Sequence, residues 1–470
     1  MKRYLGSALF IAVCILAVGC VVEPTNRANS NASVAALATP TATISPTPVS
    51  EKASKTQALT LPVLDAFLAS EPFSGLLKSR LQITDEQIAK LKEAAHADTV
   101  KLSEANAGTS PGETARARTT ARETITKIIG AEKAEQLEAL IAEQWSSDNE
   151  SAMEKAAPQS GTNDTRSPNN VPTDSRVVVN SPAYRMDVFE HGRLIKSYKI
   201  GIGYPQFPLP TGLRKARAII FNPTWTPPDE PWVAKMKDVS VGEKVEAGSR
   251  LNPLGPVKIP IGGPSLIHGG KALAKIGTFA SHGCVGLTTP QVHDFAKLLA
   301  QLGGARLTDA DIAAYERNKT ETKEVKLTKA VPVELRYETI VVEDGKLHIY
   351  RDVYDQDANT EENLRAVLDA NGIQFDELTE DIRAKILDAL AQMSGSNLPQ
   401  ATPSSRENSG NKAANASPSA SPGQTTVRKP LTRAAKNQKE IVIEIAAFSG
   451  RGYPAPVDLD TGAGPKKRRT

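Results

Sequence analysis

The most informative segment of this chain is Ser281-His282-Gly283-Cys284-Val285-Gly286-Leu287. It places a cysteine directly after a glycine and two residues after a histidine. A thiol near its reference pKa of about 8.5 is mostly protonated at neutral pH, so a nucleophilic cysteine needs an imidazole or a backbone dipole to favour the thiolate. Glycine beside it lets a substrate carbonyl approach backbone N–H groups, which can form an oxyanion hole. The segment therefore predicts acyl transfer by Cys284.

A second histidine, His268, lies upstream in Ser265-Leu266-Ile267-His268-Gly269-Gly270. On a strand, His282 and Cys284 would face the same side at positions i and i+2, so spacing alone leaves His282 open as the base. A zinc site formed by both histidines and Cys284 is also conceivable, although no fourth ligand stands at zinc spacing. The residues alone leave these roles open.

Two further blocks accompany these motifs: Asn222-Pro223-Thr224-Trp225-Thr226-Pro227-Pro228 and Asn252-Pro253-Leu254-Gly255. In this order the four segments resemble the catalytic domain of L,D-transpeptidases, a YkuD-like domain, over about 175–355. The resemblance implies a mostly β domain, a β-sandwich with a packed helix, that needs no cofactor and has no metal site. Outside it we expect α-helical accessory regions and disordered linkers.

The resemblance also implies a reaction on peptidoglycan stem peptides. A cysteine attacks the carbonyl between a diamino acid and a terminal D-alanine, D-alanine leaves, and an acceptor amine takes the acyl group in a 3→3 cross-link. Water as the acceptor would make the protein a carboxypeptidase, and a protein lysine would make it an attachment enzyme. The acceptor is left open.

The resemblance assigns roles residue by residue. It implies that Cys284 is the nucleophile and that His268 is the base, oriented by the backbone carbonyl of Gly269. His282 supports the pocket or serves as the alternative base. The resemblance therefore favours His268 over His282 as the base, whereas spacing alone does not distinguish them.

Backbone and hydroxyl groups complete the implied site. The N–H groups of Gly283 and Cys284 are candidates for the oxyanion hole, and Ser281 matches the hydroxyl position of the motif. Many family members carry arginine two residues after the cysteine, where this chain has Gly286. A guanidinium there could orient a carboxylate or position the loop, so the departure concerns substrate preference.

Three aromatic residues are candidates for lining the substrate groove: Tyr204, Trp225 and Trp232. The proline density around them forbids regular secondary structure. They could equally fill the core of a proline-rich loop. The sequence does not separate these two roles.

The N-terminus has the pattern of an export signal. Met1-Lys2-Arg3 precedes an uncharged apolar run over 5–19, which is short of the roughly 20 residues that span a membrane. Its end, Leu16-Ala17-Val18-Gly19-Cys20, resembles the lipobox of bacterial lipoproteins. A plain cleaved signal or an N-terminal membrane helix is the alternative. We expect a signal peptide over 1–19, lipidation of Cys20, and a membrane-anchored protein of the cell envelope, in the periplasm.

The net charge of the chain does not indicate a particular class of binding partner. The chain has 57 lysine and arginine residues against 53 aspartate and glutamate residues, a formal net charge of +4. This is far from the concentrated positive charge of nucleic-acid binders, so we expect no nucleic-acid partner. Three cysteines cannot form a disulfide framework. The oligomeric state stays open.

Linkers rich in Ser, Thr, Asn, Ala and Pro divide the chain into modules. After the signal peptide we predict a lipidated tether (20–57), a helical accessory region (58–145), a linker (146–174), the catalytic domain (175–355), a helical hairpin (356–393), a linker (394–438), and a short strand with a basic tail (439–470).

The helical accessory region carries a capping box, Thr84-Asp85-Glu86-Gln87. Together with the preceding Leu81-Gln82-Ile83, this segment resembles a Leu-Thr-x-x-Gln repeat of small periplasmic stress chaperones. The simpler interpretation is a helical hairpin that positions the next domain. A noncatalytic envelope protein that binds peptidoglycan or acts as a chaperone is therefore the alternative to the enzyme.

Overall fold

The computed structural model describes residues 59–102, 112–147, 167–228, 233, 236–394 and 438–463. The predicted signal peptide, the lipidation site Cys20, the tether and Trp232 lie outside these residues. None of the helices within these ranges is long and apolar enough to cross a membrane.

Five helices precede the β-rich part of the chain. They are α1 (Leu61–Leu68), α2 (Glu71–Leu81), α3 (Asp85–Val100), α4 (Glu113–Ile129) and α5 (Ala131–Ser147). Helix α3 begins where the sequence predicts, because Thr84 and Gln87 form the capping box. All five helices contribute to one apolar core that includes Leu64, Leu91 and Trp145. This region is thus a five-helix assembly rather than a single hairpin.

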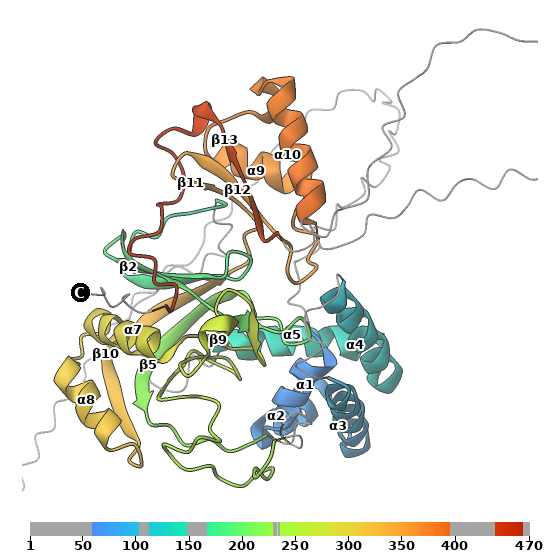
Figure 1. Cartoon of the computed structure of the whole chain (residues 1–470). Coiled ribbons are helices and arrows are strands. Elements are labelled where there is room, and N and C mark those ends of the chain that lie inside the picture. The colour runs from blue at the N-terminus through green and yellow to red at the C-terminus, as the bar shows by residue number, and fades with distance from the viewer. Residues whose placement is uncertain are drawn as a thin grey trace, which may run out of the picture. The chain divides into compact units, whose positions relative to one another are not determined.

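The β-rich part is built on an eight-stranded sheet with the order β3-β2-β1-β10-β5-β6-β7-β9 (Figure 1). The strands are β1 (Arg176–Asn180), β2 (Arg185–Glu190), β3 (Arg193–Lys199), β5 (Gly212–Phe221), β6 (Val257–Pro260), β7 (Leu266–His268), β9 (Val285–Gly286) and β10 (Lys323–Arg336). The β1–β10 and β7–β9 pairs are parallel, and the other pairs are antiparallel.

A short parallel ladder of β4 (Ile202–Gly203) and β8 (Phe279–Ser281) continues this β structure. Two backbone hydrogen bonds of 2.9 Å between Gly201 and Gly286 join the ladder to β9. The sequence predicts a mostly β domain, which is confirmed. The finer expectation is a β-sandwich, whereas the strands between residues 176 and 336 form one large sheet with a two-stranded extension.

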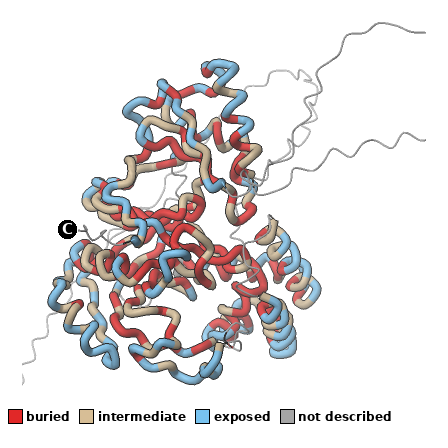
Figure 2. Tube along the Cα trace, in the orientation of Figure 1, coloured by how far each residue is buried: buried red, intermediate tan, exposed pale blue. Residues whose placement is uncertain are grey.

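Two helices belong to this β-rich part, α7 (Thr289–Leu302) and α8 (Asp309–Arg317). Thr288 and Gln291 form a capping box at the start of α7, as Thr84 and Gln87 do for α3. Apolar residues of α7, including Phe295, pack into the same core as the sheet. Figure 2 shows buried residues concentrated along these strands and the inner side of the helices. The predicted packed helix is therefore present directly after the cysteine motif.

A smaller three-stranded sheet consists of β11 (Ile340–Glu343), β12 (Lys346–Tyr350) and β13 (Glu440–Glu444). It shares a core with α9 (Glu361–Ala370) and α10 (Glu380–Met393). Short 3₁₀ turns lie at Leu273–Lys275, Phe375–Glu377 and Ala446–Phe448. The sequence assigns these elements to three different modules. The structure combines them, because β13 pairs with β12 across a long stretch of chain, with Val442 opposite His348.

Candidate active site

Cys284 lies on a bend between β8 and β9. Residues 282–284 leave the strand conformation, and Gly283 has φ +87°, a left-handed conformation that glycine adopts readily. The Ser281 hydroxyl closes this bend: it accepts a 2.9 Å hydrogen bond from the Cys284 N–H and donates a 2.5 Å hydrogen bond to the Cys284 carbonyl. The motif hydroxyl thus holds the backbone that carries the thiol.

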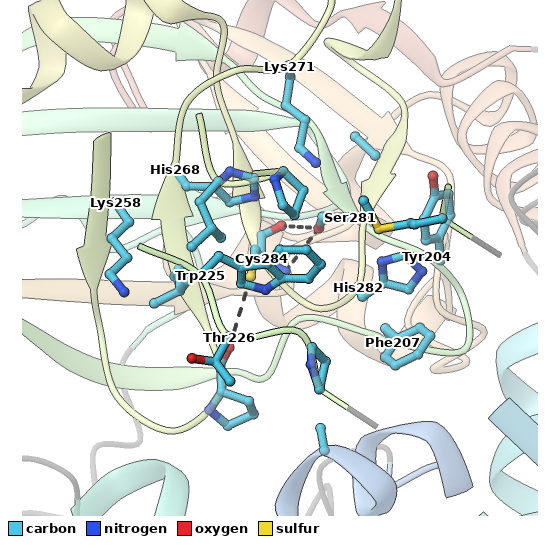
Figure 3. A pocket seen from close by; sticks show the side chains of 18 of the residues that line it. Tyr204, Phe207, Trp225, Thr226, Lys258, His268, Lys271, Ser281, His282 and Cys284 are labelled. Atoms are coloured by element: carbon cyan, nitrogen blue, oxygen red, sulfur yellow. Dashed lines mark hydrogen bonds between the residues drawn. The ribbon is translucent and has the colours of Figure 1, made fainter. Parts of the chain in front are cut away.

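The cysteine opens into a cavity of about 850 Å³ (Figure 3). Its walls include the sequence-predicted residues Tyr204, Trp225, His268, Ser281, His282 and Cys284. The Cys284 thiol is partly exposed, and its Sγ lies 4.0 Å from the Pro264 carbonyl. The fold therefore brings these predicted side chains, which come from separate sequence blocks, to one cavity.

Sheet register explains why His268 belongs to this cavity. Strands β7 and β9 pair in parallel, with Ile267 opposite Val285 and His268 opposite Gly286. Cys284 directly precedes β9 in the chain. The pairing therefore brings His268 beside the strand that follows Cys284, and both side chains line the same cavity.

His268 is buried and neutral. Its Nδ1 lies 3.0 Å from the Gly269 carbonyl, the contact that the family resemblance implies. A carbonyl only accepts, so Nδ1 carries the proton and Nε2 keeps a lone pair. Burial, helped by the positive charge of Lys271, lowers the pKa of His268 to about 3, against the opposing effect of the Gly269 and Leu254 carbonyls. The imidazole is thus uncharged at neutral pH.

His282 has aromatic neighbours instead. Its ring packs edge-on against Tyr204 and Phe207, at centroid distances of 5.3 and 4.9 Å. Burial, helped by the charges of Lys271 and Lys275, lowers the pKa of His282 to about 3. In Figure 3 the two labelled histidines lie on different sides of the cysteine. Among the described residues, no three His, Cys, Asp or Glu side chains gather as potential metal ligands.

The strand geometry that left His282 open as the base is not formed in the structure. It assumed that His282 and Cys284 occupy positions i and i+2 of a strand. Strand β8 ends at Ser281, and the bend at Gly283 follows it. Strand alternation therefore does not place the side chains of His282 and Cys284 on one face.

The two upstream blocks support the chain around His268. The Asn252 side-chain amide donates a 2.6 Å hydrogen bond to the Pro223 carbonyl, and its oxygen accepts one of 3.0 Å from the Leu254 N–H. Gly255 has φ +67°, and a Cβ there would come within 2.7 Å of the Gly269 backbone. The Asn-Pro-Leu-Gly block therefore needs its glycine, because it packs directly against the segment that follows the histidine.

The described aromatic candidates have two roles at once. Trp225 packs against Val233 and Leu254, which fills the proline-rich loop, and it also lines the cavity. Tyr204 lines the cavity too, and its N–H donates a 2.8 Å hydrogen bond to the Ser281 carbonyl. The two alternatives from the sequence are therefore compatible for these residues.

The five-helix region also reaches this cavity. Ala66, Thr99 and Leu102 contribute to its wall. The Thr60 hydroxyl donates a 2.6 Å hydrogen bond to the Gln206 carbonyl, directly before Phe207. This contact ties the helices to the loop that carries the aromatic neighbour of His282.

The sequence motifs do not identify several residues of the cavity wall. Phe207, Lys258 and Lys271 line the cavity, and none belongs to the quoted motifs. Lys271 directly follows His268-Gly269-Gly270, and this adjacency is the only available signal. Lys258 becomes visible only through strand pairing, which places it opposite His268.

The sequence of this region matches a known family. Residues 174–325 match the family model YkuD, the L,D-transpeptidase catalytic domain. This segment is therefore similar to the L,D-transpeptidase catalytic domain. The matched range contains the cysteine motif, His268 and both asparagine blocks. The five-helix region and the smaller sheet lie outside it.

Solved L,D-transpeptidases resemble the chain at low sequence identity. An L,D-transpeptidase from Mycobacterium smegmatis is 15% identical, with 35% of this chain and 58% of that protein covered and a TM-score of 0.21. One from Mycobacterium tuberculosis H37Rv is 15% identical, with 34% and 57% covered and a TM-score of 0.20. The catalytic domain of the E. faecium L,D-transpeptidase is 16% identical, with 36% and 100% covered and a TM-score of 0.23. The chain thus covers less than two thirds of the two mycobacterial proteins. No curated protein matches it.

Proposed function

We propose that this chain is a peptidoglycan L,D-transpeptidase in which Cys284 is the nucleophile and His268 is the general base. The carrying observation is the orientation of His268: its Nδ1–H is held by the Gly269 carbonyl, so Nε2 can accept a proton in the cavity that contains the thiol. The match to the L,D-transpeptidase domain supplies the substrate class, a peptidoglycan stem peptide.

Acylation follows from these groups. His268 Nε2 takes the thiol proton while Cys284 Sγ bonds to the carbonyl carbon between the diamino acid and D-alanine, and the carbonyl electron pair moves to oxygen. When that pair returns, the carbon–nitrogen bond breaks, and His268 returns the proton to the departing amine. D-Alanine leaves, and a thioester on Cys284 remains.

Gly283 is the primary oxyanion donor in this proposal. The Cys284 N–H is already bonded to the Ser281 hydroxyl, whereas the Gly283 N–H has no hydrogen-bond acceptor within the described part of the chain. The positive φ of Gly283 places this N–H in the bend beside the thiol. A developing oxyanion would therefore meet the Gly283 N–H first.

The acyl group then passes to an amine of a neighbouring stem. The amine nitrogen bonds to the thioester carbon, the carbon–sulfur bond breaks, and the proton lost by the amine returns to the thiolate through His268. The product is a 3→3 cross-link. Water as the acceptor gives a trimmed tripeptide, and a protein lysine gives attachment, so product analysis separates these outcomes.

The test uses the full chain purified in detergent with disaccharide tetrapeptide. Mass spectrometry should detect D-alanine, a cross-linked dimer, and a carbapenem adduct on Cys284. Cys284→Ser should reduce D-alanine release by at least about 10³-fold, as expected for loss of the nucleophile. D-Alanine release that persists in Cys284→Ser, or wild-type protein without release or adduct, would contradict the proposal.

We further propose that the protein is anchored in the cell envelope by lipid on Cys20, which lies outside the described residues. The lipobox-like sequence supports this location. Multiple acyl chains anchor a protein stably, whereas one does not. Cys20→Ser should move the protein from the membrane to the soluble fraction and abolish incorporation of labelled fatty acid. Cys14→Ser, in the apolar run, is the matched control and should change neither.

A further inference from the structure

Gly286 leaves a space that the side chain of Lys271, a residue of the cavity wall, occupies. A Cβ at Gly286 would come within 2.9 Å of Lys271 Cγ, 3.1 Å of Cε and 3.4 Å of Cδ. The Lys271 side chain therefore lies along Gly286 over most of its length. Its backbone is held as well, because the Lys271 N–H donates a 3.0 Å hydrogen bond to the Leu287 carbonyl. Any side chain at position 286 would displace Lys271.

The charge of Lys271 acts on the centre of the site. It lowers the pKa of both His268 and His282, so the ammonium lies within electrostatic range of both imidazoles. In Figure 3 its side chain extends toward the group formed by His268, Ser281 and Cys284. Lys271 is thus a cation of the wall of the cavity that contains Cys284 and both histidines.

The cavity as a whole favours an anion. Among the described wall residues the charged side chains are Lys258 and Lys271, and no aspartate or glutamate contributes to the wall. Both histidines are neutral at pH 7 because their pKa values are near 3. A negatively charged group entering this cavity therefore meets two cations and no carboxylate among the described wall residues.

We propose that Lys271 binds the C-terminal carboxylate of the acyl-donor peptide. This inference rests on the proposed function, in which only one residue follows the bond that Cys284 attacks. One residue spans at most about 3.6 Å, so the carboxylate must lie close to the attacked carbonyl, and its cation must stand beside the thiol. Lys271 is the candidate, because it lines the same cavity as Cys284 and lies along Gly286, two residues after the cysteine.

The test compares two donors that differ only at this carboxylate. The full chain in detergent is assayed with a disaccharide tetrapeptide ending in a free carboxylate and with its C-terminal carboxamide. Wild type should prefer the free acid by about 10- to 100-fold in kcat/KM for D-alanine or D-alaninamide release, in the range of a charge-assisted hydrogen bond. Lys271→Met should remove most of this preference by slowing the free acid alone.

Two further variants separate charge from space filling. Lys271→Arg should retain the preference. Gly286→Arg combined with Lys271→Ala places a cation in the space that the lysine vacates. This double variant should regain part of the preference for the free acid. Lys326→Met, an exposed lysine of β10 outside the cavity wall, is the matched control and should equal wild type.

The outcomes are distinct. If wild type forms the Cys284 acyl-enzyme but Lys271→Met keeps the same preference, or slows both donors equally while remaining folded by circular dichroism, Lys271 does not bind the carboxylate and the proposed function stands. If wild type acylates with neither donor, the proposed function fails together with this inference.

Discussion

The two histidines of the cavity have pKa values lowered to about 3 for the same main reason, burial, yet their surroundings differ. His268 ends a strand and has one ring nitrogen held by a carbonyl. His282 lies in a bend between the edges of two aromatic rings. Their titration therefore does not separate a base from a supporting residue. Their hydrogen bonding and packing differ, and the predictions below test whether this difference corresponds to the two proposed roles.

The largest expected difference is kinetic. His268→Gln should lower kcat for D-alanine release by about 10²- to 10⁴-fold, because it removes the proposed general base. His282→Gln should lower kcat by less than about 10-fold, because it removes a side chain that packs against Tyr204 and Phe207 rather than the proposed base. His191→Asn, in an exposed turn with positive φ, is the matched control and should equal wild type. A larger loss in His282→Gln than in His268→Gln would reverse the assignment.

The bend that carries His282 and Cys284 is closed by the hydroxyl of Ser281. Ser281→Ala removes two hydrogen bonds to Cys284, worth about 0.5–1.5 kcal/mol each. We expect a drop in the urea midpoint and about 10-fold slower acylation. Ser281→Thr keeps the hydroxyl and should recover most of both losses. Full activity in Ser281→Ala would show that the bend holds without its side-chain bridge.

Stability should respond to pH through the buried His268. Its pKa is about 3 in the folded state and about 6.5 unfolded, so between these values the unfolded chain binds the extra proton. The contribution is complete above pH 6.5 and is lost as the pH falls toward 3. His268→Gln should reduce the slope of unfolding free energy against pH by up to about 1.4 kcal/mol per pH unit. An unchanged slope in urea titrations between pH 4 and 6.5 would contradict the burial of His268.

The smallest expected effect concerns the aromatic rings that pack against His282. Phe207→Ala exposes one edge of His282 to water, which should raise the pKa of His282 toward its usual value of about 6.5. The pKa of His268 should stay low. Histidine proton resonances followed by NMR across pH 3–7 would measure both. Equal shifts in both histidines would show that the two sides are one environment.

Local signals predicted the start of α3 and the residues of the site. The capping box at Thr84 begins α3, and its hydrogen bonds span only three residues, as do those of the box that the structure shows at Thr288. The contact between His268 and Gly269 also joins neighbouring residues, so a motif can specify it. Strand β13 could not be assigned to its sheet in this way, because its partner β12 lies far earlier in the chain.

The sequence by itself determined the chemistry that is present: a thiol, two imidazoles, a hydroxyl and glycines at family spacing. Tertiary structure decided which imidazole has a nitrogen held by a carbonyl, which has aromatic walls, and which lysine lies over Gly286. The physical reason is the range of the interactions. Spacing predicts a common face only while a strand stays regular, and the positive φ of Gly283 ends that regularity beside Cys284. Beyond it, strand pairing and packing set the neighbours.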